Sequence, residues 1–211
     1  MKKQVSNDYY LQKKYTRLGR FISYFYQISY IRKSKKTKVL FIGVGDGMVA
    51  DFLRKSLDIV TLDIDQALNP DVVGDIRALS FKDREFDVVC AFEVLEHMPL
   101  SDSEKALTEL ARVSKGDVLI SVPHRRVGIE FVCRFPFIQT LLKRERIRVA
   151  LRIPVRFPGF AVSKQHYWEI DGWSLSLKKF RNILRKNFSI EKEETPVLDM
   201  YIRFFILKKK Q

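Results

Sequence analysis

The sequence predicts an α/β fold: a doubly wound, seven-stranded mixed sheet with helices on both faces and a helical lid and insert. Three observations lead to it. Short apolar runs alternate with amphipathic segments through residues 38–123, and a glycine-rich turn follows the first run. The chain of 211 residues, 46% of them hydrophobic, is long enough for about one domain. The alternation indicates parallel strands, because parallel strands need crossover connections that are usually helices.

The individual elements can be placed in order along the chain. Residues 38–42 read KVLFI, an apolar run that ends in glycines and predicts a buried strand. Similar runs predict further strands at residues 58–63, 71–75, 86–92, 117–122, 190–192 and 201–207, the last two antiparallel. Apolar residues at helical spacing predict helices over residues 9–31, 48–55, 101–113 and 177–188. Ser101 and Glu104 have the spacing of a capping box at the start of the third helix.

The charges divide the chain into blocks. Residues 39–123 carry 16 acidic and 8 basic side chains, whereas residues 1–38 carry 1 and 11, and residues 124–165 carry 2 and 10. We therefore expect a basic, aromatic, helical lid at residues 1–37 and a main domain at residues 38–211, with a basic apolar insert at residues 124–165. Such asymmetry favours an anionic partner, and a merely solvated lysine-rich surface is the plain alternative.

Several classes of protein are excluded by what the sequence lacks. No apolar run approaches the roughly 20 residues that span a bilayer, and the N-terminus has no apolar signal core. Two cysteines, Cys90 and Cys133, are too few for a disulfide framework, so a reducing, cytoplasmic environment is expected. No histidine and cysteine cluster has the spacing of a structural zinc site, and no metal site is predicted.

The first strand runs into three alternating glycines, Gly43, Gly45 and Gly47. Glycine lets the backbone turn sharply and lets a ligand approach it closely. A dinucleotide fingerprint would have glycine or alanine where this chain has Met48, and the Gly-Lys-Ser/Thr ending of a phosphate loop is absent. The turn therefore favours a nucleoside without a pyrophosphate. Asp63 ends the second strand, where a carboxylate can accept hydrogen bonds from ribose hydroxyls.

Three more residues follow strands at the same edge of the sheet. Ile64 is placed to pack against a purine, Asp75 to accept from an exocyclic amine, and Glu93 to border the crevice after the fourth strand. A turn residue and a helix-start charge are the plain alternatives for Asp75 and Glu93.

The stretches VLFIGVGDG, VTLDID, VVGDI and FDVVCAFEVLEHM resemble class I S-adenosylmethionine-dependent methyltransferases, in particular the small-molecule, methyltransferase type 11-like group. The resemblance covers residues 38–123 and implies a Rossmann-like fold with S-adenosylmethionine as cofactor. It implies that the glycine turn faces the methionine part of the cofactor. The cofactor-binding residues that it implies are Gly43, Gly45 and Gly47, Asp63 for the ribose, Ile64, Asp75 and Ile76 for the adenine, and Phe92 and Glu93 near the sulfonium.

One position departs from the pattern of this family. The family usually has an acidic residue two positions before the first glycine, where this chain has Phe41. The change removes one polar anchor for the amino-acid end of the cofactor, and Asp46 inside the turn is a substitute.

The residues that act on the acceptor are predicted from the requirements of methyl transfer. The leaving group departs neutral, so the protein mainly aligns the reactants in a dry site. A base is needed only when the acceptor is a hydroxyl or a protonated amine. We expect His166, in the phrase HYWEID, to be the base or a substrate-orienting group, with His124 after the fifth strand as the second choice. A histidine that only closes the cavity is the alternative, and Glu96 with His97 is expected to act as a helix-start charge pair.

The insert at residues 124–165 mixes arginines with large apolar side chains. That mixture suits an amphiphilic anionic substrate or a membrane surface, and a lid whose arginines point to water explains it equally well. The sequence thus predicts methyl transfer to a small-molecule, lipid or glycan-precursor acceptor. Two other classes stay open. Basic flanks with aromatics favour an RNA methyltransferase, although no RNA module is present. The Phe41 departure favours a non-catalytic cofactor-binding protein.

Overall fold

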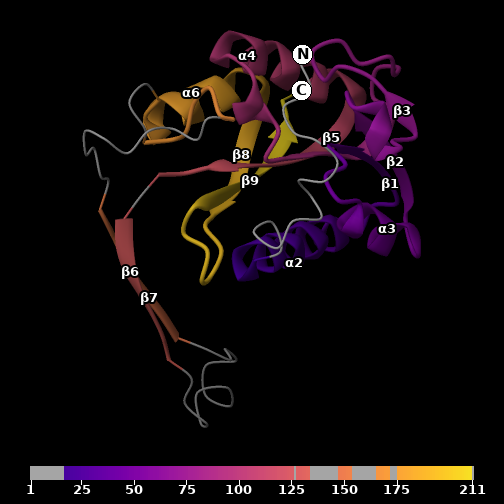
Figure 1. The fold of residues 1–211 in the computed structure, drawn as a ribbon. Helices are drawn as coiled ribbons and strands as arrows, with labels where there is room; N and C mark the ends of the chain where they lie inside the picture. Colours follow the sequence, from indigo (N-terminus) through magenta and orange to yellow (C-terminus); the bar gives the residue numbers. More distant parts are fainter. Residues whose placement is uncertain (1–16, 126, 134–146, 154–164, 172–174, 211) are drawn as a thin grey trace.

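The computed structural model describes residues 17–125, 127–133, 147–153, 165–171 and 175–210. A seven-stranded mixed sheet runs through the molecule in the order β3-β2-β1-β4-β5-β9-β8 (Figure 1). Its strands are β1 (Lys38–Ile42), β2 (Asp58–Asp63), β3 (Val72–Val73), β4 (Phe86–Phe92), β5 (Ser114–Pro123), β8 (Phe188–Glu194) and β9 (Ile202–Lys209). The helices are α2 (Leu18–Lys33), α3 (Met48–Arg54), α4 (Leu100–Val113) and α6 (Leu177–Asn187), with short 3-10 turns at Gln66–Leu68 and Leu95–His97. The predicted doubly wound mixed sheet is confirmed.

The strand directions indicate which edge of the sheet is expected to bind a ligand. Strands β1 to β5 are parallel, whereas β9 is antiparallel to both β5 and β8. The chain order reverses at β1, which lies between β2 and β4. In open sheets of this kind, ligands bind beyond the carboxyl ends of the strands at such a reversal. The residues after β1, β2 and β4 therefore lie together at this carboxyl edge of the sheet.

Two apolar cores cover the two faces of the sheet. Helices α2 and α3 bury residues such as Ile31 and Leu53 against one face, and α4 and α6 bury Leu110 and Phe180 against the other. Fully burying a side chain of this size contributes about 1.5–3 kcal/mol, so each amphipathic stripe holds its helix on the sheet. The helices on both faces follow from these stripes.

The predicted capping box at the start of α4 is wrong. The helix begins at Leu100, after Pro99, and no side chain caps its first turn. The hydroxyl of Ser103 instead donates to the carbonyl of Leu95 at 2.9 Å, inside the protein. Proline supplies the helix start by its fixed backbone angle.

The predicted helical character of the insert is also wrong for its described residues. Residues Val127–Cys133 form β6 and Ile147–Ile153 form β7, and the two pair antiparallel as a separate two-stranded ribbon. This hairpin projects away from the main sheet (Figure 1). Its two sequences, VGIEFVC and IRVALRI, alternate with period two and are rich in β-branched residues, which favours strands. The rest of the insert lies outside the described residues.

Helix α2 confirms the helical part of the N-terminal segment from Leu18 onward, and residues 9–16 lie outside the described part. Within the described residues, no helix combines the length and apolarity that a bilayer crossing requires. Cys90 is a buried free thiol and Cys133 an exposed one.

Candidate active site

The glycine turn after β1 has the backbone that the sequence predicts. Gly43, Gly45 and Gly47 have φ values of 84°, 60° and 78°, in the left-handed region that glycine adopts without strain. A β-carbon on Gly43 would lie 2.6 Å from a methyl carbon of Val94, so the segment after β4 packs directly on the turn. Only glycine fits this close approach.

Asp63 holds the turn in place from the end of β2. Its Oδ2 accepts a hydrogen bond from the amide of Val44 at 2.8 Å, and its Oδ1 accepts from the amide of Asp65 at 2.9 Å. The structure therefore brings the glycine turn and Asp63 together, as the sequence predicts. Each carboxylate oxygen has a second lone pair, so the two bonds leave acceptor capacity for ribose hydroxyls.

Helix α2 fastens the end of β4. Glu93 has φ of 55°, a strained angle for a residue with a β-carbon. Its carboxylate accepts from Arg20 at 3.0 Å and from Ser23 at 3.1 Å, both on α2. Strain of this kind concentrates at ligand sites, where the surrounding structure maintains it. The N-terminal helix thus contacts Glu93, the residue predicted to lie near the sulfonium.

Phe41, which stands where the family usually has an acidic residue, is part of the apolar core. Its ring is 3% exposed and lies 5.8 Å from the ring of Phe92, so neither can offer a polar anchor. The acidic side chain of the turn is Asp46, which is exposed and accepts from the hydroxyl of Tyr24 at 2.6 Å and the amide of Met48 at 3.2 Å. Asp46 is thereby held at the mouth of the turn.

The residues predicted for adenine lie along the next part of the crevice. Ile64 is half-buried after β2, and Ile76 is buried. The carboxylate of Asp75 binds the guanidinium of Arg77 in a bidentate pair, with contacts of 2.6 to 3.1 Å. This pairing lowers the pKa of Asp75 to about 2. Asp75 is therefore ionised at neutral pH, and its guanidinium partner is a contact that the sequence did not predict.

His124 has a buried position with partners on both ring nitrogens. Arg203 donates to Nδ1 at 2.9 Å, so the proton of the neutral ring is on Nε2, which faces Asp171 at 2.9 Å. The side chain is 1% exposed. These contacts join the end of β5 to β9 and to the segment before α6. They give His124 a structural role in holding these segments together. His166, unlike His124, is only half-buried.

His166 lies in a cluster of polar side chains beside the end of β4. Its Nδ1 is 2.9 Å from Oε1 of Glu169, which also accepts from the hydroxyl of Tyr201 at 2.8 Å. Its ring centroid lies 5.1 Å from that of His97. Burial and the charge of Glu169 raise the pKa of Tyr201, so its hydroxyl stays protonated. Glu96, 1% exposed, completes the cluster.

Sequence reasoning missed the importance of Glu96 and His97. Glu96 does stand in the first turn of the 3-10 helix Leu95–His97, as expected, but its side chain is buried, which the sequence did not indicate. The signal was present in the adjacent glutamate and histidine after β4 and in the three-residue spacing of His166 and Glu169. Neither spacing shows that the two pairs meet.

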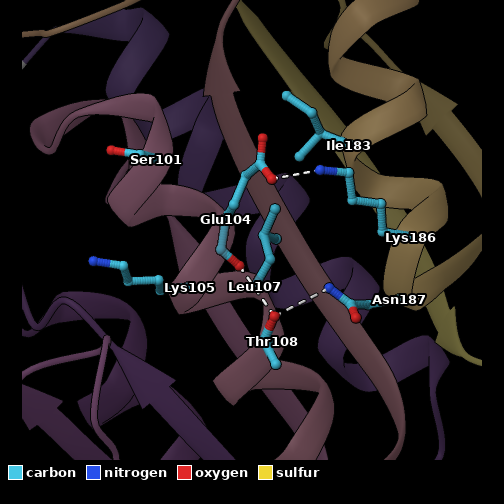
Figure 2. A pocket seen from close by; sticks show the side chains of 8 residues that line it. All are labelled: Ser101, Glu104, Lys105, Leu107, Thr108, Ile183, Lys186 and Asn187. Atoms are coloured by element: carbon cyan, nitrogen blue, oxygen red, sulfur yellow. Dashed lines mark hydrogen bonds and ion pairs between the residues drawn. The ribbon is translucent and has the colours of Figure 1, made fainter.

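A separate groove lies between α4 and α6 and contains none of the predicted site residues (Figure 2). Two interactions cross this groove: an ion pair between Glu104 and Lys186, and a hydrogen bond that Asn187 donates to Thr108. Asn187 precedes β8, whose first residue pairs with the last residue of β9, near the amino end of β5. The Asn187 end of the groove therefore lies near the amino end of β5, whereas Ser101 and Glu104 belong to the first turns of α4.

The comparisons with known proteins agree with this geometry. Residues 40–122 match the family model described as a methyltransferase domain. No curated protein matches the chain in sequence.

Solved structures share the fold at low sequence identity. Magnesium protoporphyrin IX methyltransferase from Synechocystis PCC 6803, with bound S-adenosylhomocysteine, has 17% identity and a TM-score of 0.62 over 100% of this chain and 90% of that chain. The 1,6-didemethyltoxoflavin-N1-methyltransferase of Burkholderia thailandensis has 12% identity and a TM-score of 0.57 over 90% and 79%. The small RNA methyltransferase HEN1 has 16% identity and a TM-score of 0.57 over 90% of this chain and 25% of that chain.

The sheet order, the glycine turn and the family match together define the class of protein. Residues 40–122 match a methyltransferase domain, the chain shares the fold of solved S-adenosylmethionine-dependent methyltransferases, and the matched domain implies S-adenosylmethionine as cofactor. The donor set fits that cofactor, because a left-handed glycine turn and the carboxylate of Asp63 meet at one point.

Proposed function

We propose that this methyltransferase acts on a small-molecule, lipid or glycan-precursor acceptor that enters between the glycine turn and the cluster around His166. The single observation that supports it is the meeting of the turn with the segment after β4, because Val94 touches Gly43 and Glu96 and His97 follow within three residues. A donor site and a polar acceptor site therefore adjoin.

The residues have distinct roles in this proposal. Gly43, Gly45 and Gly47 admit the cofactor, and Asp63 binds its ribose. S-adenosylmethionine supplies a methyl carbon on a positively charged sulfur. With the cofactor bound, the acceptor's lone pair would take that carbon as the carbon–sulfur bond breaks, and the bonding electrons would stay on sulfur. A hydroxyl or ammonium acceptor also loses a proton, for which His166 is the base or the group that orients the acceptor.

Calorimetry with S-adenosylhomocysteine tests the donor half of this function. We expect one site per chain with micromolar affinity, and transfer of a labelled methyl group to a lipid or small-molecule fraction. Absence of heat with both S-adenosylmethionine and S-adenosylhomocysteine would remove the proposed function. Saturable binding without transfer to any fraction would favour a non-catalytic protein.

We further propose that the β6–β7 hairpin brings the site to an anionic membrane surface, which suits an amphiphilic acceptor. Ile129, Phe131 and Val149 are 61%, 62% and 61% exposed. Phe131 pairs with Val149, and Ile129 is two residues away on the same strand, so the three share one face of the ribbon. The insert that carries them has 10 basic and 2 acidic side chains. An apolar face on an insert of net positive charge fits an anionic lipid surface.

Vesicle sedimentation tests this hairpin. The protein should bind vesicles of phosphatidylcholine with phosphatidylglycerol more tightly than vesicles of phosphatidylcholine alone, and less tightly in 0.5 M salt. The double substitution Phe131→Ser and Val149→Ser should weaken binding by roughly tenfold or more, because it removes two side chains that the membrane would bury.

Val73→Ser is the matched control, because Val73 is also an exposed strand valine, at 53% exposure, but lies on the edge strand β3. Equal binding by the double variant and the control contradicts the proposal. Salt-sensitive binding to RNA with none to vesicles would favour the RNA methyltransferase, and sedimentation without vesicles would assign the apolar face to a second copy of the chain.

A further inference from the structure

We propose that Glu96, His97 and His166 bind a divalent first-row transition ion beside the cofactor crevice. The sequence predicts no metal here, because His166 is 69 positions from His97 and no spacing rule joins them. In the folded chain, one potential ligand atom from each residue lies within 4.8 Å of the other two. The three atoms would have to move closer together for one ion to bind all of them with bonds of about 2.0–2.2 Å.

The hydrogen bonds of the two histidines select the ring nitrogen that can bind a metal. Nδ1 of His97 is 2.9 Å from the carbonyl oxygen of Gln165, and a carbonyl only accepts, so Nδ1 carries the proton. Nδ1 of His166 faces the carboxylate of Glu169 at the same distance. Each ring therefore has its lone pair on Nε2. Metal-binding histidines generally donate their other nitrogen to a carbonyl or a carboxylate in this way.

The carboxylate of Glu96 gives a second, independent indication that a cation binds here. Its Oε2 is buried and has no hydrogen-bond partner in the described part of the chain. An unpaired buried carboxylate is costly, and a cation at its open oxygen would offset that cost.

The donor set indicates the chemical class of the ion. Two imidazoles and one carboxylate suit Zn²⁺, Mn²⁺, Fe²⁺ or Co²⁺ better than Mg²⁺ or Ca²⁺, which prefer oxygen ligands. Three protein ligands also leave positions open for an acceptor oxygen, whose pKa the ion would lower. This catalytic meaning rests on the proposed function. It assigns to His166 the orienting role, exerted through the ion, in place of the role of base.

Metal titration without cofactor tests the site directly. The probes are Co²⁺, followed by its visible absorption, and Zn²⁺, followed by calorimetry, with the Cys133→Ser protein so that the exposed thiol does not bind them. We expect one ion per chain. Glu96→Gln and His166→Gln should each weaken Co²⁺ binding at least tenfold. Glu104→Gln is the matched control, because that carboxylate lies on the surface, and it should leave binding unchanged.

Two results would overturn the inference. One is the absence of stoichiometric binding of both ions, and the other is binding that Glu96→Gln and His166→Gln leave intact. If the buried Glu96 variant does not fold by circular dichroism, the half-buried His166 variant decides the test. A protein that binds S-adenosylhomocysteine but no metal ion would contradict the metal site and leave the proposed function standing. A protein that binds the metal ion but not S-adenosylhomocysteine would support the metal site and contradict the proposed function.

Discussion

Gly43→Ala is expected to reduce the affinity for S-adenosylhomocysteine by at least about a hundredfold and to lower the melting temperature by roughly 10 °C. Two costs combine. A residue with a β-carbon at φ of 84° loses about 1–2 kcal/mol, and the new carbon would lie 2.6 Å from Val94. Relieving that contact displaces either the glycine turn or the segment after β4. Calorimetry and thermal unfolding measure the two effects.

Gly116→Ala is the matched control for this substitution. A β-carbon on Gly116 meets nothing within 4 Å, and its φ is not in the left-handed region. Both affinity and melting temperature should stay near the wild-type values. Adding Val94→Ala to Gly43→Ala should restore part of the stability, because it removes the methyl group in the way. A Gly43→Ala protein that binds like the wild type would show that the turn does not face the cofactor.

Asp63→Ala should weaken S-adenosylhomocysteine about a hundredfold. The substitution removes the acceptor for the amides of Val44 and Asp65, so the turn loses its anchor. It also removes the predicted acceptor for the ribose. Hydrogen bonds to a charged group contribute about 1.5–3 kcal/mol each, and the loss of the two that the ribose hydroxyls would donate to Asp63 accounts for the hundredfold weaker binding. Calorimetry of the folded variant measures it.

Asp65→Ala is the comparison for Asp63→Ala. Asp65 is a carboxylate two residues along the chain that accepts from the amide of Ala67 at 3.1 Å, a local contact outside the glycine turn. We expect its affinity within about threefold of the wild type. Equal losses for Asp63→Ala and Asp65→Ala would mean that general charge near the crevice, and not the anchored turn, binds the ligand.

The glycine turn and its contact with Asp63 were predictable because their signals are local. A strand followed by three glycines, and a carboxylate at the end of the next strand, each leave a pattern within a few residues. The partner of Asp75 was not predicted, although Arg77 is only two residues away, because the sequence does not show which of several cations a carboxylate contacts. The strand character of residues 127–133 was also local, in their alternation, but the basic and aromatic composition of the insert led to a helical prediction.

The sequence by itself determined the parallel core, the left-handed glycine turn and the position of Asp63, because periodicity and backbone freedom act over short stretches. Only the tertiary structure decided that Arg20 and Ser23 hold Glu93, that His124 is enclosed by Arg203 and Asp171, and that His166 meets Glu96 and His97. These contacts join segments tens of residues apart. The packing of whole elements on the sheet brings such segments together, and no local pattern records that packing.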